Sequence, residues 1–275
     1  MEPTALTIVT GFDARARADV FDSLAVALAD KATARSHACG RDLTAYLDET
    51  RPRRAIVEAS DVFSVVDQVL RGSSGSTRLH GIVTVVDACA AAARLAVGEG
   101  IAPTARAAAQ VMVADGIALT GFDRVTPSAR LDIDLSIREV NPRAIVRDVA
   151  CSRWLDLVSF DASCPDAIVQ RSSVPSGTRR VRGVVSVVRE VGAVFERARV
   201  CSWLASLMSG ALGVVLRFEA VLPIDDGLAL VAFGVPPTFS YETVSVATGT
   251  SGRVWVVGAH IDAAGLTAQL VDGNH

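Results

Sequence analysis

Short apolar runs separated by helical segments are the feature that most constrains how the first 150 residues of this chain fold. A continuous apolar run is typical of a strand buried on both faces, as in a parallel sheet. Parallel strands need long crossover connections, which the intervening helical segments supply. The alternation therefore predicts an α/β fold with a doubly wound, mostly parallel sheet. The runs are LTIVT at 6–10, RAIVEA at 54–59, GIVTVV at 81–86, GIALT at 116–120 and AIV at 144–146.

The run at 81–86 is the strongest strand signal in the chain, so we expect it inside the sheet and parallel to both of its neighbours. Helices are predicted between the runs, at 41–47, 61–70 and 131–140. Asp61 stands directly before one of these segments and is the residue type that caps a helix N-terminus.

The pattern changes after about residue 150, where strands are no longer separated by regular crossover helices. Residues 165–180 contain PSGTRR and are expected to be part of a linker. We therefore predict a first domain at 1–150, a linker at 151–180 and a smaller α+β domain at 181–275. The last of these has expected strands at 183–188, 214–222, 228–235 and 253–257, with helices at 197–208 and after Asp262.

Composition narrows the functional classes. Half of the 275 residues are hydrophobic and the mean hydropathy is +0.37, but charges interrupt every apolar stretch, so no membrane span is expected. The N-terminal residues lack the basic region of a signal peptide. The five cysteines are scattered without a CxxC pair, which indicates a reduced, cytoplasmic setting. A net charge of -3 does not favour sequence-specific DNA binding.

A series of short motifs resembles, in order and over nearly the whole chain, the CobW family of P-loop GTPases and metal chaperones. In the second half, LRFEAVL at 216–222 and VG at 257–258 followed by Asp262 resemble strands of the CobW C-terminal domain. The resemblance implies a P-loop-NTPase-like sheet followed by that smaller domain. The matching segments of the first half are GF at 11–12, EAS at 58–60, VVDA at 85–88, Gln110 with AD at 114–115, and NPRA at 141–144.

The nucleotide-binding residues of the family are largely absent from this chain. A P-loop uses small residues to expose backbone N–H groups, a Lys for the β- and γ-phosphates and a Ser or Thr for magnesium. Here the loop begins at Gly11, the Lys position is Arg17, and the hydroxyl positions are Ala18 and Asp19. The resemblance therefore leaves Gly11 and Arg17 as parts of a degenerate site, or of an ordinary strand–turn–helix with solvated charges.

The guanine-reading and switch segments are also reduced. The resemblance aligns the Asn and Lys of the guanine-reading motif with Thr120 and Gly121, so that only Asp123 remains. Asp123 is then either a residual contact for guanine or an ordinary turn residue. The family's switch segment, between the P-loop helix and its CxCC motif, has no counterpart between Asp19 and Cys39. No catalytic residue is therefore predicted.

The CxCC metal motif of the family is represented by HAC at 37–39, where one cysteine remains and one position is histidine. His37 and Cys39 supply two zinc ligands of the usual types, although structural zinc sites ordinarily have four. The alternatives are a residual zinc site completed from elsewhere, or a loop histidine beside a packed cysteine.

A possible partner site is the basic cluster in the predicted linker. Arg179, Arg180 and Arg182, with Arg171 upstream, are either a solvated loop or a surface that contacts phosphate. The segment PPTFSY at 236–241 is expected to be a loop that exposes aromatic residues to a protein partner.

Two functions follow from the resemblance and its losses. One is a non-catalytic adaptor, a pseudo-GTPase in zinc or metal homeostasis or zinc-limitation stress, which binds a protein partner, the ribosome or a ribosome-associated stress factor. Such a protein needs no cofactor. The alternative is a reduced metallochaperone that still binds GTP and carries zinc or another divalent metal.

Overall fold

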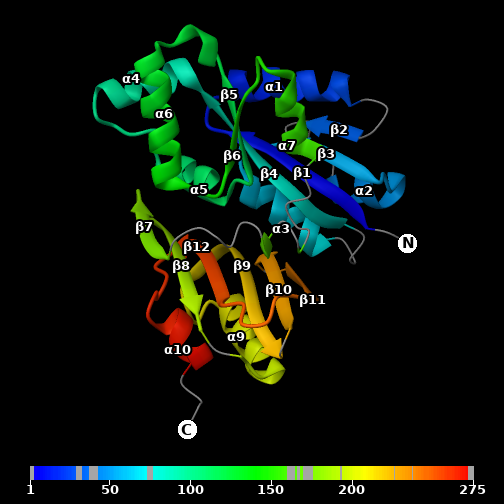
Figure 1. The fold of residues 1–275 in the computed structure, drawn as a ribbon. Helices are drawn as coiled ribbons and strands as arrows, with labels where there is room; N and C mark the ends of the chain where they lie inside the picture. Colours follow the sequence, from blue (N-terminus) through cyan, green and yellow to red (C-terminus); the bar gives the residue numbers. More distant parts are fainter. Residues whose placement is uncertain are drawn as a thin grey trace. The chain divides into compact units, whose positions relative to one another are not determined.

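The structure is a computed structural model, and it describes residues 3–28, 33–36, 43–72, 77–159, 165, 168–169, 176–192, 194–225, 227–236 and 238–271. The chain divides into two compact units, Met1–Ala162 and Ser163–His275 (Figure 1). No helix in the described ranges is long and apolar enough to cross a membrane.

A six-stranded sheet in the order β2-β3-β1-β4-β5-β6 forms the centre of the first unit. All neighbouring strands are parallel, as predicted. The segment 81–86 lies within β4, between β1 and β5, so its expected interior position is confirmed. The strands are β1 (Thr4–Gly11), β2 (Thr33–Ser36), β3 (Arg54–Glu58), β4 (Thr77–Asp87), β5 (Gly116–Thr120) and β6 (Ile145–Asp148).

Helices cover both faces of this sheet, which confirms the doubly wound arrangement. One face packs against α1, the 3-10 helix η3 and α7, around Val9, Leu24 and Trp154. The other face contacts α3 and α5, and α5 contacts α6. The helices are α1 (Ala14–Ala27), α2 (Leu43–Thr50), α3 (Val62–Gly72), α4 (Ala88–Ala96), α5 (Ala105–Val113), α6 (Pro127–Val140) and α7 (Asp156–Ser159), with 3-10 helices η2 (Phe122–Arg124) and η3 (Ser152–Leu155).

Side-chain caps start several of these helices. Asp61 accepts a hydrogen bond from the Phe63 N–H at 3.2 Å, which confirms its predicted capping role before α3. Asp87 Oδ1 accepts from the Ala90 N–H at 2.8 Å and so starts α4 directly at the end of β4. These caps fix where each strand ends and therefore define the carboxyl edge of the sheet.

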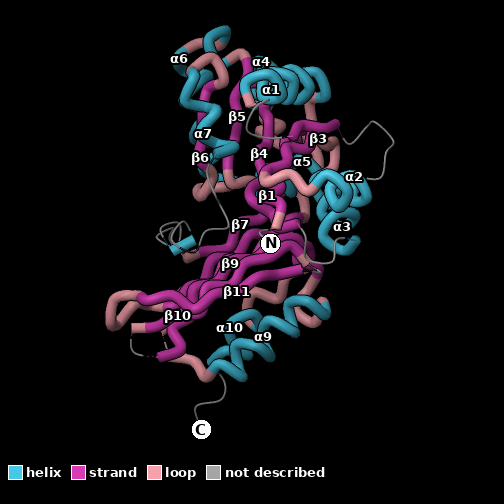
Figure 2. The backbone as a smooth tube through the Cα atoms, turned by 90° about the vertical axis from the view of Figure 1, so that its right-hand side faces the viewer, coloured by secondary structure: helices cyan, strands magenta, loops and turns pink. Residues whose placement is uncertain are grey.

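The second unit contains a six-stranded antiparallel sheet in the order β11-β10-β9-β12-β8-β7. Its helices α9 (Arg197–Ser209) and α10 (Gly265–Val271) lie on one face (Figure 2). The parallel sheet with a second, smaller α+β unit is the predicted fold class. The strands are β7 (Gly177–Val181), β8 (Val184–Val191), β9 (Val214–Asp225), β10 (Leu228–Val235), β11 (Thr238–Ser245) and β12 (Gly252–Ala259).

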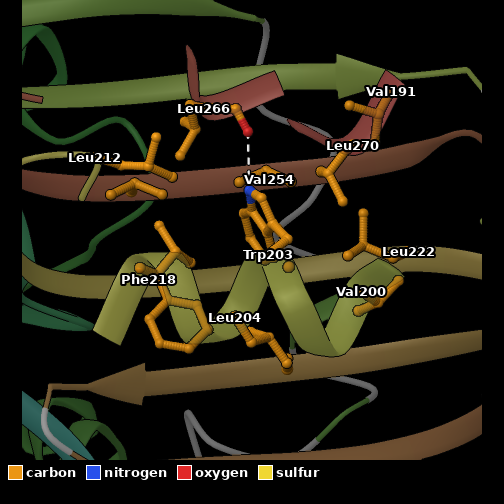
Figure 3. Packing of buried hydrophobic residues seen from close by; sticks show 14 of the residues in the cluster. Val191, Val200, Trp203, Leu204, Leu212, Phe218, Leu222, Val254, Leu266 and Leu270 are labelled. Carbon is orange, nitrogen blue, oxygen red and sulfur yellow. Dashed lines mark hydrogen bonds between the residues drawn. The ribbon is translucent and has the colours of Figure 1, made fainter. Parts of the chain in front are cut away.

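Trp203 is the centre of the core between this sheet and its helices (Figure 3). Its ring meets Phe218 edge to face, with centroids 6.4 Å apart, and its Nε1 donates to the Leu266 carbonyl oxygen at 2.8 Å. The indole therefore joins α9, β9 and α10 without leaving its N–H unpaired. The opposite face of the sheet carries a buried ion pair in which Arg217 Nη2 donates to Glu219 Oε1 at 3.0 Å.

Several sequence expectations need correction. Both ends of the predicted linker 151–180 belong to folded units. Trp154 packs into the hydrophobic core of the first unit, and β7 pairs with β8 in the sheet of the second unit. Residues 238–241 of the expected aromatic loop lie in β11, because the chain turns back directly after β10 and pairs with it as the next strand. The strand predicted at 81–86 begins earlier, at Thr77, so that His80 is a buried residue within β4.

Candidate functional site

The carboxyl ends of the parallel strands in the first unit are where an open α/β sheet ordinarily binds ligands. The chain leaves β1 toward β2 on one side of the sheet, whereas it leaves β3 toward β4 on the other side of β1. The strand order therefore reverses beside β1, which ends at Gly11. The turn between β1 and α1 is the place where a nucleotide phosphate would be expected.

The turn between β1 and α1 is very short, and the side chain of its last residue caps the helix that follows. Only Phe12 and Asp13 separate Gly11 from the first residue of α1. Asp13 Oδ1 accepts a hydrogen bond from the Ala16 N–H at 2.8 Å, and the Asp13 carbonyl oxygen accepts from the Arg17 N–H at 3.1 Å. The Ala16 N–H, which the helix itself leaves without a backbone partner, is therefore satisfied by Asp13, whereas a P-loop presents such groups to phosphate.

Arg17 is directed back into the protein. Its Nη1 donates to the Gly11 carbonyl oxygen at 2.7 Å, and its Nε donates to Oε1 of Glu58 at the end of β3. The side chains of Arg17 and Glu58 are only 11% and 9% exposed. The guanidinium is thus neutralised by a buried carboxylate and held at the strand ends.

Gly11 itself serves close packing between strands. A Cβ atom at this position would lie 2.5 Å from the carbonyl oxygen of Val85 on β4, its partner in the sheet register. Any other residue would have to push β1 and β4 apart. The glycine that begins the P-loop in the CobW family is therefore required here by the sheet, whether or not a phosphate binds.

Gln110 on α5 ties the ends of two strands together. Its Nε2 donates to Thr10 Oγ1 near the end of β1 at 2.9 Å and to the carbonyl oxygen of Ser60, just after β3, at 2.7 Å. Thr84 Oγ1 of β4 donates to the backbone carbonyl of Gln110 at 2.8 Å. The Gln110 side chain is 1% exposed, so these bonds form a buried polar network. Its role in this arrangement is to hold the sheet edge in shape.

Asn141 at the end of α6 makes a second buried network, between α5 and β5. Its Nδ2 group donates to the carbonyl oxygens of Val111, Met112 and Ala114 at 2.8, 3.2 and 2.9 Å. Its Oδ1 accepts from the N–H groups of Arg143 and Ala144 at 3.1 and 3.2 Å.

Asp115 completes this corner, because its Oδ2 accepts from the N–H of Ile82 on β4 at 2.8 Å. The AD and NPRA motifs thus satisfy backbone groups that would otherwise be buried unpaired. Sequence reasoning found these motifs only as parts of a resemblance. The side-chain-to-backbone bonds that explain them join residues about 30 positions apart, and no local pattern reveals them.

Asp123 lies in η2, beyond the end of β5, and is exposed. Its backbone carbonyl oxygen accepts from Arg130 Nη2 at 3.1 Å. The preceding Gly121 has a φ of 61°, and a Cβ there would come within 2.5 Å of Arg124 Nη2. The position that corresponds to the guanine-reading lysine is thus covered by the Arg124 side chain.

Comparison with known proteins identifies the architecture. No family model and no curated protein matches the sequence. The chain is similar to the Zn(II)-bound YjiA GTPase from E. coli, with a TM-score of 0.69 and 17% identity over 99% of both chains. It is also similar to a Zn(II)-bound triple mutant of YjiA, in which one glutamate and two cysteines are replaced by alanine. The TM-score is again 0.69 and the identity 18%, over 99% of both chains.

The chain has the fold of a CobW-type P-loop GTPase. At this level of identity the likeness concerns the fold alone. The CobW-type fold nevertheless accounts for the order of the sequence motifs, since GF, VVDA and AD stand at the ends or starts of β1, β4 and β5.

The two predicted metal ligands, His37 and Cys39, lie outside the described residues. Within the ranges that the structure describes, no group of three or more His, Cys, Asp and Glu residues is placed to hold a metal ion. Cys89, Cys151 and Cys201 are free thiols.

The arginines predicted to bind a partner lie on a hairpin of the second unit and not in a linker loop. Arg179 and Arg180 belong to β7, and Arg182 occupies the turn to β8 with a φ of 51° beside Gly183 at 84°. Two consecutive positive φ values are the geometry of a tight hairpin turn. Arg171 is outside the described residues. The three described arginines thus lie on one edge strand of the sheet and its turn.

Proposed function

We propose that this chain is a non-catalytic, CobW-like adaptor, a pseudo-GTPase in zinc or other metal homeostasis or in the response to zinc limitation. The observation that carries the proposal is the engagement of Arg17 with Glu58 and Gly11 at the position of the P-loop lysine. A side chain that is already neutralised and buried does not offer its charge to a phosphate. In this proposal the fold is retained because its surfaces bind a partner.

The charges around the turn argue against a bound triphosphate. The Asp13 carboxylate caps α1 in the region where phosphate charge would accumulate, and the Arg17 charge is already paired with Glu58. Two like charges 4 Å apart repel by about 4 kcal/mol at an effective dielectric constant near 20. Ala18 and Asp19 replace the hydroxyl that would hold magnesium, so a magnesium ion would not be held there to offset this repulsion.

Calorimetric titration with magnesium-GTP, GDP and ATP tests the proposal. We expect no binding at cellular nucleotide concentrations and only background hydrolysis. A micromolar dissociation constant, about -8 kcal/mol, would overturn it. The matched variant is Asp123→Ala. If GTP binds the parent protein and Asp123→Ala removes the preference for GTP over ATP, Asp123 reads the base as in an active family member.

The proposed adaptor binds a macromolecular partner, either a protein or the ribosome with its stress factors. Arg179, Arg180 and Arg182 support a phosphate-bearing partner, because one hairpin holds them together. The test is affinity capture with the full chain from zinc-starved and zinc-replete cells. We expect ribosomal components that are lost at high salt and on replacing all three arginines by alanine. Capture of the same components by that triple variant would refute this surface.

The second candidate is a reduced metallochaperone that binds GTP and carries zinc or another divalent metal. It is favoured by the His37 and Cys39 side chains and by the two zinc-bound neighbours. Zinc titration with His37→Ala and Cys39→Ala separates the two candidates. The adaptor predicts weak or no binding to the monomer, whereas the metallochaperone predicts tight binding that each change weakens. Tight binding that survives both changes would place the metal elsewhere.

A further inference from the structure

The two edges of the second sheet, β7 and β11, differ in how they are protected from other strands. They lie at opposite ends of the strand order (Figure 1). An edge strand presents unpaired backbone groups, and proteins ordinarily protect it with charged residues or proline. β7 has two charged residues among five, Arg179 and Arg180. β11 has the sequence TFSYETVS, in which Glu242 is the only charge.

The register of β11 defines which of its backbone groups point outward. The β10–β11 hairpin has a two-residue turn, so Val235 and Thr238 at its base exchange both hydrogen bonds. Alternate residues then pair with β10 in the same way, and the residues between them direct their N–H and C=O groups to the open edge. The residues whose backbone N–H and C=O groups face away from β10 are Phe239, Tyr241, Thr243 and Ser245.

Aromatic side chains occupy the same edge. Phe239 and Tyr241 are 40% and 48% exposed, and their rings stack with centroids 6.2 Å apart. Phe239 also contacts the buried Phe218, with centroids 6.4 Å apart, and Phe218 in turn contacts Trp203. The core of the second unit thus continues through Phe239 to a partly exposed tyrosine at the sheet edge. This combination of open backbone groups and apolar surface fits another strand.

We propose that β11 pairs antiparallel with β11 of a second copy of this chain, with Tyr241 on the two-fold axis. In this register Phe239 lies opposite Thr243 of the other copy, which is a favourable aromatic–β-branched pair. Ser240 lies opposite Glu242, so its hydroxyl donates to the carboxylate. Both contacts occur twice, as an isologous interface requires.

The single charge of the strand disfavours the neighbouring register that is centred on Glu242. Moving the axis by one residue to Glu242 would bring two carboxylates directly opposite each other, which is unfavourable. β7 does not offer an equivalent solution, because an axis at Arg179 or Arg180 would oppose two guanidinium groups. The pattern of charges therefore favours self-association through β11 and disfavours it through β7.

Sedimentation velocity of the full chain over a range of concentrations tests the pairing. We expect a reversible monomer–dimer equilibrium that Thr243→Pro abolishes. The N–H of Thr243 points away from β10, so proline removes a bond to the second copy without removing one within the hairpin. Thr178→Pro on β7 is the control, since the Thr178 N–H also points away from its neighbour β8; it costs only the exposed side-chain bond that Arg189 Nη2 donates to Thr178 Oγ1 at 2.9 Å. This control should dimerise like the parent chain.

Cysteine cross-linking checks the register independently of the proline variant. Residues opposite each other in a hydrogen-bonded antiparallel pair have Cα atoms about 5.5 Å apart, within reach of a disulfide. Tyr241→Cys should therefore form a cross-linked dimer under mild oxidation. Thr243→Cys keeps Glu242 and lies opposite Phe239 of the other copy, four residues from its own counterpart, so it should not exceed the background from the native cysteines.

A parent chain that stays monomeric at all concentrations overturns the proposal. So does a dimer that survives Thr243→Pro while Tyr241→Cys fails to cross-link, because another surface then makes the contact. Far-UV circular dichroism of each variant shows whether it is folded. If Thr243→Pro does not fold, the cross-linking pair decides alone. The dimer does not depend on the nucleotide titration, so the two proposals fail separately.

Discussion

The β1–α1 turn and the corner formed by α5, β5 and α6 belong to the same unit, and both resemble CobW sequences. They differ in which of the motif residues are kept. At the corner, Asp115 and Asn141 match the family and bond to backbone groups. At the turn, the phosphate-binding residue types are absent, and Asp13 and Arg17 bond to their own chain. The difference separates residues that the fold needs from residues that a ligand needs.

The comparison shows how the chain itself supplies hydrogen-bond and charge partners at the position of the P-loop. Orphan N–H groups and a buried cation both require partners, whichever molecule supplies them. Asp13 and Glu58 supply these partners within the protein. The corner offers no such substitution, because its buried carbonyl and N–H groups depend on Asn141.

The largest effect is expected at the corner. Asn141→Ala removes five hydrogen bonds and leaves buried carbonyl groups unsatisfied, so the free energy of unfolding should fall by about 4 kcal/mol. Urea denaturation measures it. Arg138→Ala is the control on the same helix, because its ion pair with Asp134 is largely exposed and should contribute about 0.5 kcal/mol or less. Equal losses in both variants would remove the distinction between the two regions.

An intermediate effect is expected for the ion pair at the turn. Arg17→Met removes the guanidinium beside buried Glu58, and the free energy of unfolding should fall by about 3 kcal/mol. The double variant Arg17→Met, Glu58→Leu should recover most of this loss, because no buried charge remains. A double-mutant cycle in urea measures the coupling. A negligible loss in Arg17→Met would mean that Arg17 is available to an external anion, contrary to the adaptor proposal.

The smallest effect is expected at the helix cap. Asp13→Ala exposes the Ala16 N–H and should cost about 1 kcal/mol of stability, whereas Asp13→Gly should cost only a few tenths. Asp19→Ala, an exposed position on the same helix, serves as the control. Thermal unfolding monitored by circular dichroism resolves the series. If Asp13→Ala is neutral in stability and gains GTP binding, the cap is an obstacle to nucleotide and not a support of the helix.

Local sequence determined most of the first unit. Buried parallel strands read as apolar runs, and capping residues such as Asp61 bond within a few positions, so both signals are contained in short windows. Hence the parallel sheet and the interior position of 81–86 were predictable, as were β8, β9, β10, β12, α9 and α10 of the second unit. Gly11, Arg17 and Asp123 were located as positions, but the bonds that explain them were not.

Tertiary structure alone decided which partners those residues meet. Arg17 and Glu58 are 41 positions apart, and only the pairing of β1 with β3 brings them together. The same holds for 177–181 and 238–245, which become the two edges of one sheet and not a linker and a loop. Strand order depends on contacts between distant segments, whereas periodicity reports only whether a segment is buried. The contrast between a basic edge and an aromatic edge therefore exists only in the folded chain.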